Sequence, residues 1–190
     1  MVLSQSPARQ IIAIDMDEVI ADSLGEHLNR YNRDFSSATR PPVTREDLRG
    51  RRLWQVAPAE LHPVLDNYFR DEDFFRVVPV MPDAQRVVAR LQTRYEVFIA
   101  SAAMEVPTSF APKFAWLGEH FPFIPPSHIV FCGDKSILRA DFLIDDNPRQ
   151  LQSFRGEGII YTSPANFYVS GYRRVDNWEA VEAMFLDATA

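Results

Sequence analysis

The strongest constraint on the fold is a set of short apolar runs, each of which ends at polar or turn-forming residues. Runs of about four residues that are apolar on both faces are typical of strands buried inside a parallel sheet. Periodicity alone does not separate such a strand from a short buried helix, but the shortness of the runs favours strands. The sequence therefore predicts five central strands, at residues 11–14, 97–100, 128–131, 142–144 and 158–161.

Helical patterns alternate with these runs after residue 80. Residues 83–94 place Ala84, Val87, Val88 and Leu91 on one stripe, which is the spacing of an amphipathic helix. Two more helices are predicted, at 113–120 and 178–186. The alternation of strand and helix indicates an α/β fold, in which helices cover both faces of a doubly wound parallel sheet.

Residues 24–80 break this alternation. They are polar, helical or irregular, and punctuated by proline and glycine. We interpret them as a small helical insertion after the first strand, which leaves 1–23 and 81–190 as the core domain. A chain of 190 residues is long enough for one substantial domain with such an insertion, and too short for two large domains.

Charge and composition exclude several classes of protein. The net charge of −6 disfavours a binder of nucleic-acid polymers, because such proteins present a basic surface to the phosphate backbone. Cys132 is the only cysteine, so an internal disulfide is excluded and the reducing cytoplasm is the simplest location. No apolar stretch approaches the roughly 20 residues of a membrane-spanning helix, so a membrane partner is not expected.

Polar side chains follow three of the predicted strands. Asp15 follows the first run, Ser101 the second, and the pair Asp145-Asp146 the fourth. Ligands of open α/β sheets bind beyond the carboxyl ends of the strands. We therefore expect these side chains to converge on one crevice.

Asp15 and Asp17 stand two residues apart at the end of the first strand, where both carboxylates can reach one site. One carboxylate can attack a phosphoryl group and form an acyl-phosphate. The other can protonate the leaving oxygen and then take a proton from the attacking water. The spacing alone is equally typical of a turn or a helix cap.

Asp145 and Asp146 would add ligands for a magnesium ion. Mg²⁺ prefers oxygen ligands and takes one or two carboxylates, here Asp15 and Asp146 with the carbonyl of Asp17. The ion would offset the repulsion between an anionic nucleophile and an anionic substrate. An isolated Asp-Asp pair is more typical of a solvated turn, so this prediction depends on its joint occurrence with Asp15 and Asp17.

Ser101 would donate a hydrogen bond to a transferring phosphoryl oxygen, and Lys135 would balance its charge. Each residue alone is a weak signal, because serine often caps a strand end and lysine is usually solvated. Lys113 competes with Lys135 for the cationic role.

The order of these motifs resembles that of the haloacid dehalogenase superfamily of phosphatases. The first motif covers residues 11–19, the second 98–101 and the fourth 142–146, with Lys135 as the third. The four motifs match in order and in strand context, and they span nearly the whole chain. The resemblance implies a parallel-sheet core whose insertion, 24–80, is a helical cap that closes over the substrate and excludes water.

The same resemblance implies a role for each motif residue. Asp15 would be the nucleophile, Asp17 the acid/base, and Asp146 a direct magnesium ligand with Asp145 in support. Phosphate would be bound by Ser101, Ala102 and Lys135.

A narrower resemblance is to the 5′(3′)-deoxyribonucleotidases. Residues 15–22 are similar to the first motif of that family, and 74–76 followed by 79–84 are similar to its return from cap to core. The ten-residue step from Lys135 to Asp145 also fits. The resemblance implies that the substrate is a small phosphate ester, namely a nucleoside monophosphate. It also implies that Phe75 belongs to the substrate pocket.

The chain departs from the family pattern in its cap. Glu18 stands where the family has glycine, and Ser23 stands where it has an aromatic residue. Arg51 and Arg52 follow Gly50 where the family has further aromatic residues that stack on the base. The two arginines either meet a second anionic group on the substrate or form a solvated basic stretch.

Three alternatives stay open at this stage. One is a phosphatase for another small phosphate ester. A dehalogenase of the same fold is disfavoured because Asp17, which protonates an alkoxide leaving group, is present. A catalytically silent binding module would lack a motif aspartate or the lysine, and none is missing.

A homodimer is compatible with the sequence, and an exposed apolar patch on the cap would support it.

Overall fold

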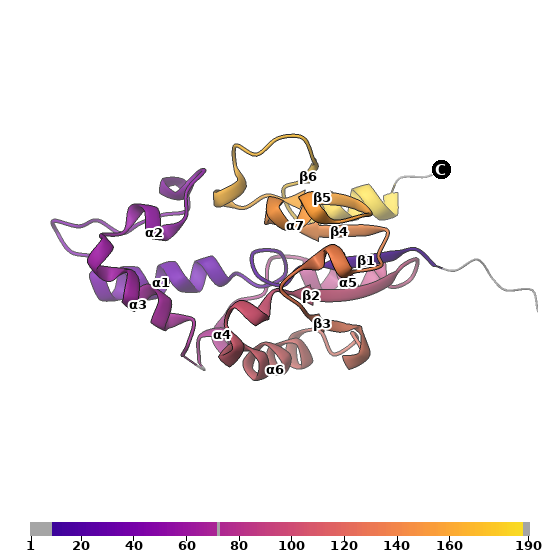
Figure 1. The fold of residues 1–190 in the computed structure, drawn as a ribbon, viewed down its shortest axis with the longest axis horizontal. Helices are drawn as coiled ribbons and strands as arrows, with labels where there is room; N and C mark the ends of the chain where they lie inside the picture. The colour runs from indigo at the N-terminus through magenta and orange to yellow at the C-terminus, as the bar shows by residue number, and fades with distance from the viewer. Residues whose placement is uncertain (1–8, 72, 188–190) are drawn as a thin grey trace, which may run out of the picture.

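A computed structural model describes residues 9–71 and 73–187. Its centre is a six-stranded parallel sheet with the order β3-β2-β1-β4-β5-β6 (Figure 1). Ile14 at the end of β1 lies opposite Ile99 of β2 and Ile144 of β4, so the carboxyl ends of the central strands share one edge. The strands are β1 (Ile11–Ile14), β2 (Glu96–Ser101), β3 (Ile129–Phe131), β4 (Phe142–Asp145), β5 (Glu157–Tyr161) and β6 (Arg173–Val175).

All five predicted strands are present, but the sheet has a sixth strand that the sequence analysis did not predict. The sixth strand, β6, pairs with β5 at the edge of the sheet. Its residues are Arg173, Arg174 and Val175, and only Val175 is buried. A strand with two arginines and one apolar residue has no apolar run, which is why the sequence pattern did not reveal it.

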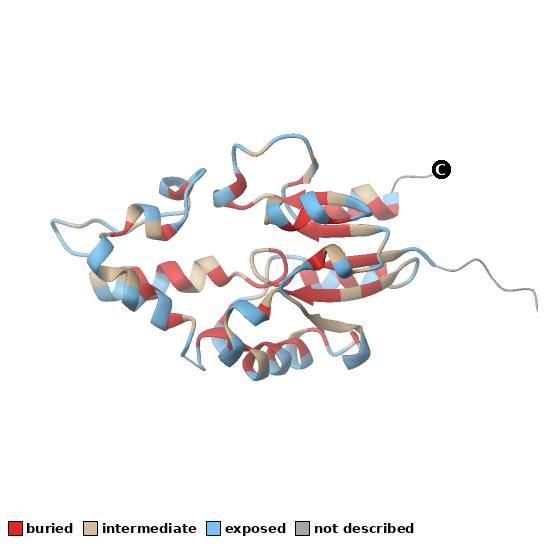
Figure 2. Cartoon of the chain, in the orientation of Figure 1, coloured by how far each residue is buried: buried red, intermediate tan, exposed pale blue. Residues whose placement is uncertain are grey.

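Both faces of the sheet are buried, as the short apolar runs predicted (Figure 2). Ile12 and Ile14 belong to the larger apolar cluster, whereas Ala13 between them packs with Leu143 and Ile160 in a second cluster. Neighbouring residues of a strand point to opposite faces, so these two clusters are the two cores on either side of the sheet.

In the described chain an α-helix follows β2, β4 and β6 of the core, whereas only a short 3₁₀ helix follows β3 and β5. One predicted helix, 178–186, is α8 only in its first part and continues as a π-helix over Ala183–Asp187. The core helices are α5 (Ala84–Leu91), α6 (Phe110–His120), α7 (Pro148–Ser153) and α8 (Trp178–Glu182). Short 3₁₀ helices cover Glu46–Leu48, Ala59–Leu61, Ala103–Glu105, Pro107–Ser109, Pro126–His128, Lys135–Ile137 and Pro164–Asn166.

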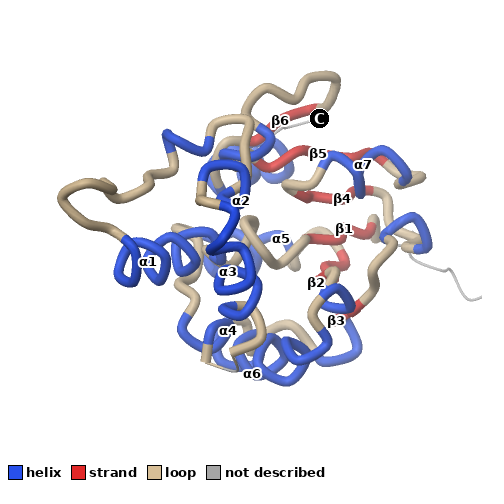
Figure 3. The backbone as a smooth tube through the Cα atoms, turned by 60° about the vertical axis from the view of Figure 1, so that its left-hand side comes forward, coloured by secondary structure: helices blue, strands red, loops and turns tan. Residues whose placement is uncertain are grey.

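In the part of the chain that the structure describes, four α-helices lie between β1 and α5, and we call this segment the insertion (Figure 3). They are α1 (Ser23–Phe35), α2 (Leu53–Val56), α3 (His62–Tyr68) and α4 (Phe74–Val77). Its two ends meet, because Ala21 and Val80 form an antiparallel bridge. The amide of Asp22 donates to the carbonyl of Pro79 at 2.8 Å, which closes the base of the insertion.

The insertion also contacts the core at Gly50. Its amide donates to the carbonyl of Pro164 at 2.8 Å, and its φ of 72° lies in the left-handed region that favours glycine. A Cβ atom at this position would lie 2.5 Å from the ring of Tyr168. Beside it, the guanidinium of Arg49 lies 4.5 Å from the ring centroid of Phe167. In the part of the chain that the structure describes, none of the helices has the length and apolarity that crossing a membrane requires.

Candidate active site

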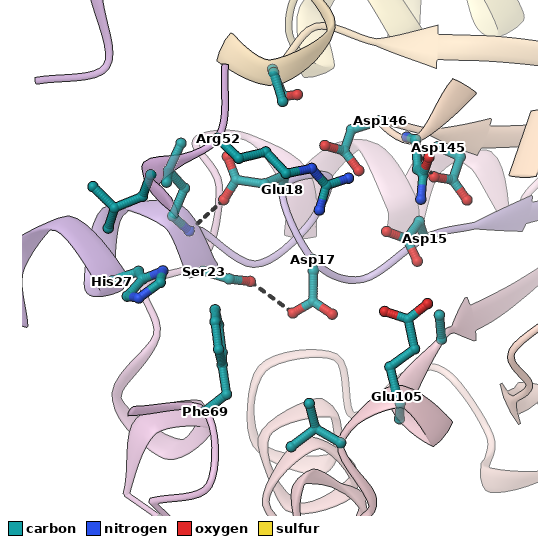
Figure 4. Close-up of a pocket in the computed structure, with 18 of the residues that line it drawn as sticks. Asp15, Asp17, Glu18, Ser23, His27, Arg52, Phe69, Glu105, Asp145 and Asp146 are labelled. Carbon is teal, nitrogen blue, oxygen red and sulfur yellow. Dashed lines mark hydrogen bonds between the residues drawn. The ribbon is translucent and has the colours of Figure 1, made fainter. Parts of the chain in front are cut away.

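A cavity of about 420 Å³ opens at the carboxyl edge of the sheet, between the core and the insertion (Figure 4). Asp15 and Asp17 reach it from the loop after β1, and Lys135 from the 3₁₀ helix after β3. Asp145, the last residue of β4, and Asp146 complete this wall. The structure therefore brings together side chains that follow β1, β3 and β4.

Lys135 is held between two carboxylates. Its ammonium donates to Oδ2 of Asp145 at 2.6 Å and also to Oδ1 of Asp15. Gln150 fixes the backbone here, because its Oε1 accepts from the amide of Lys135 at 3.1 Å and its Nε2 donates to the carbonyl of Gly133 at 3.0 Å. Gln150 was not predicted, since nothing in the sequence pattern marks it.

Lys113 occupies the other side of the site. It donates to Oδ2 of Asp17 and, at 3.3 Å, to Oγ of Ser101. Ser101 is fully buried, and the next residue, Ala102, lines the cavity. Ser23 donates to Oδ1 of Asp17 at 2.7 Å. Both lysines that competed for the cationic role thus lie in the site, each paired with a different aspartate.

The two aspartates after β1 differ in their pKa. Burial raises the pKa of Asp15 to about 7, despite the nearby Lys135, and the carboxylates of Asp145 and Asp17 add to the rise. Burial also acts to raise the pKa of Asp17, but the ammonium of Lys113 outweighs it and the pKa lies below its ordinary value. Asp17 is therefore the more readily ionised of the pair.

Asp15, Asp145 and Asp146 form a candidate site for a metal ion. Each offers a carboxylate oxygen, and these oxygens all lie within 4.8 Å of one another. Burial and the charges of Asp145 and Asp15 raise the pKa of Asp146 well above its ordinary value. Hard oxygen donors crowded together, with Lys135 offsetting part of their charge, fit a small divalent cation such as Mg²⁺.

Glu18 links the loop after β1, which carries Asp15 and Asp17, to the insertion, a contact that the sequence did not predict. Its Oε1 accepts from the amide of Leu24 at 2.6 Å, and its Oε2 accepts from Arg45 at 3.1 Å. Arg45 also pairs with Asp22 at the start of α1. The backbone of Glu18 has a φ of 60°, a conformation that favours glycine. Burial raises the pKa of Glu18 to about 7, although Arg45 opposes the rise.

Aromatic rings from the insertion form the wall that faces the carboxylates. Phe75, predicted to line the pocket, does so and lies 4.5 Å from Nζ of Lys113. His27 packs edge-on against Phe69 at 4.6 Å and Trp54 at 5.1 Å. Among the described residues, none hydrogen-bonds its buried Nε2. Burial lowers the pKa of His27 to about 4, so the ring is neutral.

Arg51 and Arg52 also line the cavity, at the junction between the insertion and the core. Nη2 of Arg51 donates to the carbonyl of Asp47 at 2.7 Å. The side chain of Arg52 extends from the insertion into the cavity (Figure 4). Every residue that the sequence singled out for the site therefore lies in this cavity or, for Ser101, in contact with a residue that lines it.

Solved structures of haloacid dehalogenase-like hydrolases share the fold. One from Deinococcus radiodurans, with bound phosphate and sodium, has a TM-score of 0.59 at 15% identity, and 97% of each chain is covered. A haloacid dehalogenase-like protein of Streptococcus pneumoniae has a TM-score of 0.58 at 12% identity, covering 93% of this chain and 98% of the other. The fold of this chain is thus that of the haloacid dehalogenase-like hydrolases.

The family model for "5′ nucleotidase, deoxy (Pyrimidine), cytosolic type C protein" matches residues 9–190, and the chain belongs to this family of phosphoric monoester hydrolases. A Staphylococcus aureus (strain Mu50) protein assigned as a 5′(3′)-deoxyribonucleotidase is 48% identical over 179 residues, covering 94% of this chain and 97% of its own. The 5′(3′)-deoxyribonucleotidase of Bacillus subtilis (strain 168) is 36% identical over 183 residues, covering 94% and 99%.

Proposed function

We propose that this chain is a magnesium-dependent 5′(3′)-deoxyribonucleotidase that works through an aspartyl-phosphate intermediate on Asp15. The observation that carries the proposal is the convergence of Asp15, Asp17 and Asp146 with Lys135 at one end of the sheet. The family of the chain makes a nucleotide the natural choice of phosphate ester.

Asp15 is the proposed nucleophile. Lys135 holds Oδ1 of its carboxylate, so that Oδ2 is the oxygen that attacks phosphorus. A magnesium ion held by Asp15, Asp145 and Asp146 would supply charge neutralisation for the nucleophile and the phosphoryl group. Because burial raises the pKa of Asp15 to about 7 in the protein alone, this carboxyl is only about half ionised at neutral pH, and the added positive charge would favour its ionised form.

Asp17 is the proposed acid/base. In the first half-reaction the oxygen of Asp15 bonds to phosphorus, the P–O ester bond breaks, and Asp17 gives a proton to the leaving oxygen. Because Lys113 holds the pKa of Asp17 below its ordinary value in the protein alone, Asp17 must first take up that proton when the substrate binds. In the second half-reaction water attacks the same phosphorus and returns a proton to Asp17, releasing phosphate and restoring Asp15. The hydrogen bonds from Lys113 and Ser23 hold the Asp17 carboxylate in place for both transfers.

Residues 24–80 act in this proposal as a cap domain over the core domain of 1–23 and 81–190. The cap supplies Trp54, Phe69 and Phe75 to the cavity wall, where a base has aromatic surface to lie against. These rings take the place of the family's aromatics at Ser23 and at the two arginines. Water is excluded from the aspartyl-phosphate when the substrate fills the space between the two domains.

The test is phosphate release from a panel of esters, with and without magnesium. The panel contains deoxyribonucleoside and ribonucleoside monophosphates, sugar phosphates and bisphosphates. We expect magnesium-dependent release that favours deoxyribonucleotides, and no turnover in the variant Asp15→Asn, because an amide is a poor nucleophile and a weaker metal ligand.

Three other results would change the proposal. Release only from sugar phosphates or other esters would keep the mechanism and move the substrate. Turnover near the wild-type rate in Asp15→Asn would exclude the covalent mechanism. An absence of release from every ester would mean that the chain is a binding module of the same fold.

A further inference from the structure

A second cavity, of about 310 Å³, adjoins the active-site cavity. Its walls come from Gly50, Arg51, Arg52 and Gln55 of the insertion and from the loop around Asn147 in the core. Arg51, Arg52 and Asn147 line both cavities, so one ligand can occupy both. The charged side chains that line the second cavity, within 9–71 and 73–187, are the two arginines alone.

The two arginines differ from their neighbours in their ion pairs. Four arginines lie between residues 45 and 52, and the first two of them have carboxylate partners. Arg45 pairs with Glu18 and Asp22, and Arg49 pairs with Glu46. Across the described chain, Arg51 and Arg52 have no carboxylate oxygen within 4.0 Å. The arginines that line the two cavities are therefore the ones that, among the described residues, form no close ion pair with an acidic side chain.

The backbone that carries these two arginines is fixed on both sides. The amide of Gly50 donates to Pro164 of the core, and the ring of Tyr168 packs where a side chain at Gly50 would stand. The amide of Arg52 donates to Oε1 of Gln55 at 2.7 Å at the start of α2. A guanidinium on an anchored backbone loses less conformational freedom on binding than one on a mobile loop.

The acidic side chains that line the active-site cavity would repel a second anionic group there. Among the described residues, seven acidic residues line it, Asp15, Asp17, Glu18, Asp66, Glu105, Asp145 and Asp146. The transferring phosphate would be balanced there by Lys113, Lys135 and the cation that Asp15, Asp145 and Asp146 would hold. A second phosphate on the same substrate is stabilised only where positive charge is unpaired, which is at Arg51 and Arg52.

We infer that the second cavity is an anion subsite and that the preferred substrate is a deoxyribonucleoside 3′,5′-bisphosphate. One phosphate lies at Asp15 and is hydrolysed, while the other lies against Arg51 and Arg52 and is retained. The planar guanidinium group binds phosphate through two parallel hydrogen bonds, which suits this second role. This inference rests on the proposed function, since it names the substrate class of the same site.

The test compares kcat/KM for a deoxyribonucleoside 3′,5′-bisphosphate with kcat/KM for the matching 5′-monophosphate. We expect the wild type to prefer the bisphosphate by about tenfold or more, the value of one hydrogen bond between charged groups. In the double variant Arg51→Gln, Arg52→Gln this ratio should fall toward one. The matched control is Arg70→Gln, an exposed arginine of the insertion that lines neither cavity, and it should keep the wild-type ratio.

Either of two results overturns the inference. One is a wild-type ratio of one or less, and the other is a double variant with the wild-type ratio. Hydrolysis of monophosphates without a preference for bisphosphates leaves the proposed function intact and removes only the subsite. If no ester is hydrolysed, the proposed function fails, and calorimetry still decides on the subsite. The bisphosphate should then bind Asp15→Asn about tenfold more tightly than the monophosphate, and equal affinities would overturn the subsite.

Discussion

Lys135 donates a hydrogen bond from its ammonium to Oδ2 of Asp145 at 2.6 Å, and both side chains are only 1% exposed. Buried ion pairs of this kind contribute little compared with a well-packed apolar pair, but removing one partner alone is costly. Burial alone would lower the pKa of Lys135, yet the carboxylates of Asp15 and Asp145 raise it above its ordinary value, so the lysine stays charged.

Replacing Lys135 by methionine should therefore remove activity and stability together. The change leaves the carboxylates of Asp15 and Asp145 buried without their cation, and we expect a loss of about 3–5 kcal/mol in the free energy of unfolding. Urea denaturation in the presence of a chelator measures it. Adding Asp145→Asn should recover part of the stability but none of the turnover. A loss below about 1 kcal/mol in Lys135→Met would contradict this account of the pair.

Magnesium should reverse the stability order of the wild type and Asp146→Asn. Without a cation, Asp146 is repelled by Asp145 and Asp15, so the neutral amide should melt at a higher temperature than the wild type. With magnesium at about 100 times its Kd, the wild type should gain about 2.7 kcal/mol, and the variant much less. Scanning calorimetry in chelator and in magnesium checks both orders. Parallel shifts of the two proteins would rule out Asp146 as a ligand.

Arg45 should matter more for stability while Glu18 is present, although it also pairs with Asp22. Arg45→Gln leaves a carboxylate with 13% of its side chain exposed without its cation, and we expect a loss of about 1–3 kcal/mol. Glu18→Gly removes the carboxylate and suits the φ of 60°. In that background Arg45→Gln should cost much less, giving a coupling energy of about 1–2 kcal/mol. If the two losses simply add, the contact between Glu18, in the loop after β1, and Arg45 of the insertion contributes nothing to stability.

His27 should make the protein less stable in mild acid. Its pKa is about 4 in the folded chain, because burial opposes the charged ring, against an ordinary value of 6.5. Between these values the unfolded chain binds the extra proton, so stability is complete above pH 6.5 and falls as the pH drops toward 4. The loss amounts to about 3 kcal/mol below pH 4. His27→Phe lacks this contribution, and unfolding curves across the pH range that run parallel to the wild type would refute it.

The sheet and the positions of the candidate site residues could be predicted from the sequence for one physical reason. A strand buried on both faces must be apolar throughout, so the polar residue at which it ends is conspicuous, as Asp15 is after β1 and Asp145 is at the end of β4. The same reasoning overlooked β6, because an edge strand is exposed and Arg173 and Arg174 can occupy it.

Contacts between segments far apart in the chain could not be read in this way. Arg45 contacts Glu18, which lies 27 residues earlier in the chain, and Gln150 contacts Lys135, which lies 15 residues earlier. No periodic pattern in the sequence predicts either contact. The position of His27 is a further example. It follows the helical spacing of α1 like any core residue, and only the packing of Phe69 and Trp54 around it makes it part of the cavity wall.

The bridge between Ala21 and Val80 gives the insertion a modular character. The two backbones leave and rejoin the core within hydrogen-bonding distance, with the amide of Met81 donating to Ile20 at 2.9 Å. The segment between them is thus an insertion whose two ends are already paired. An insertion of different length could start and end at the same two points without displacing Asp15 or Asp17. Such a replacement would change the substrate pocket and leave the residues of the proposed chemistry in place.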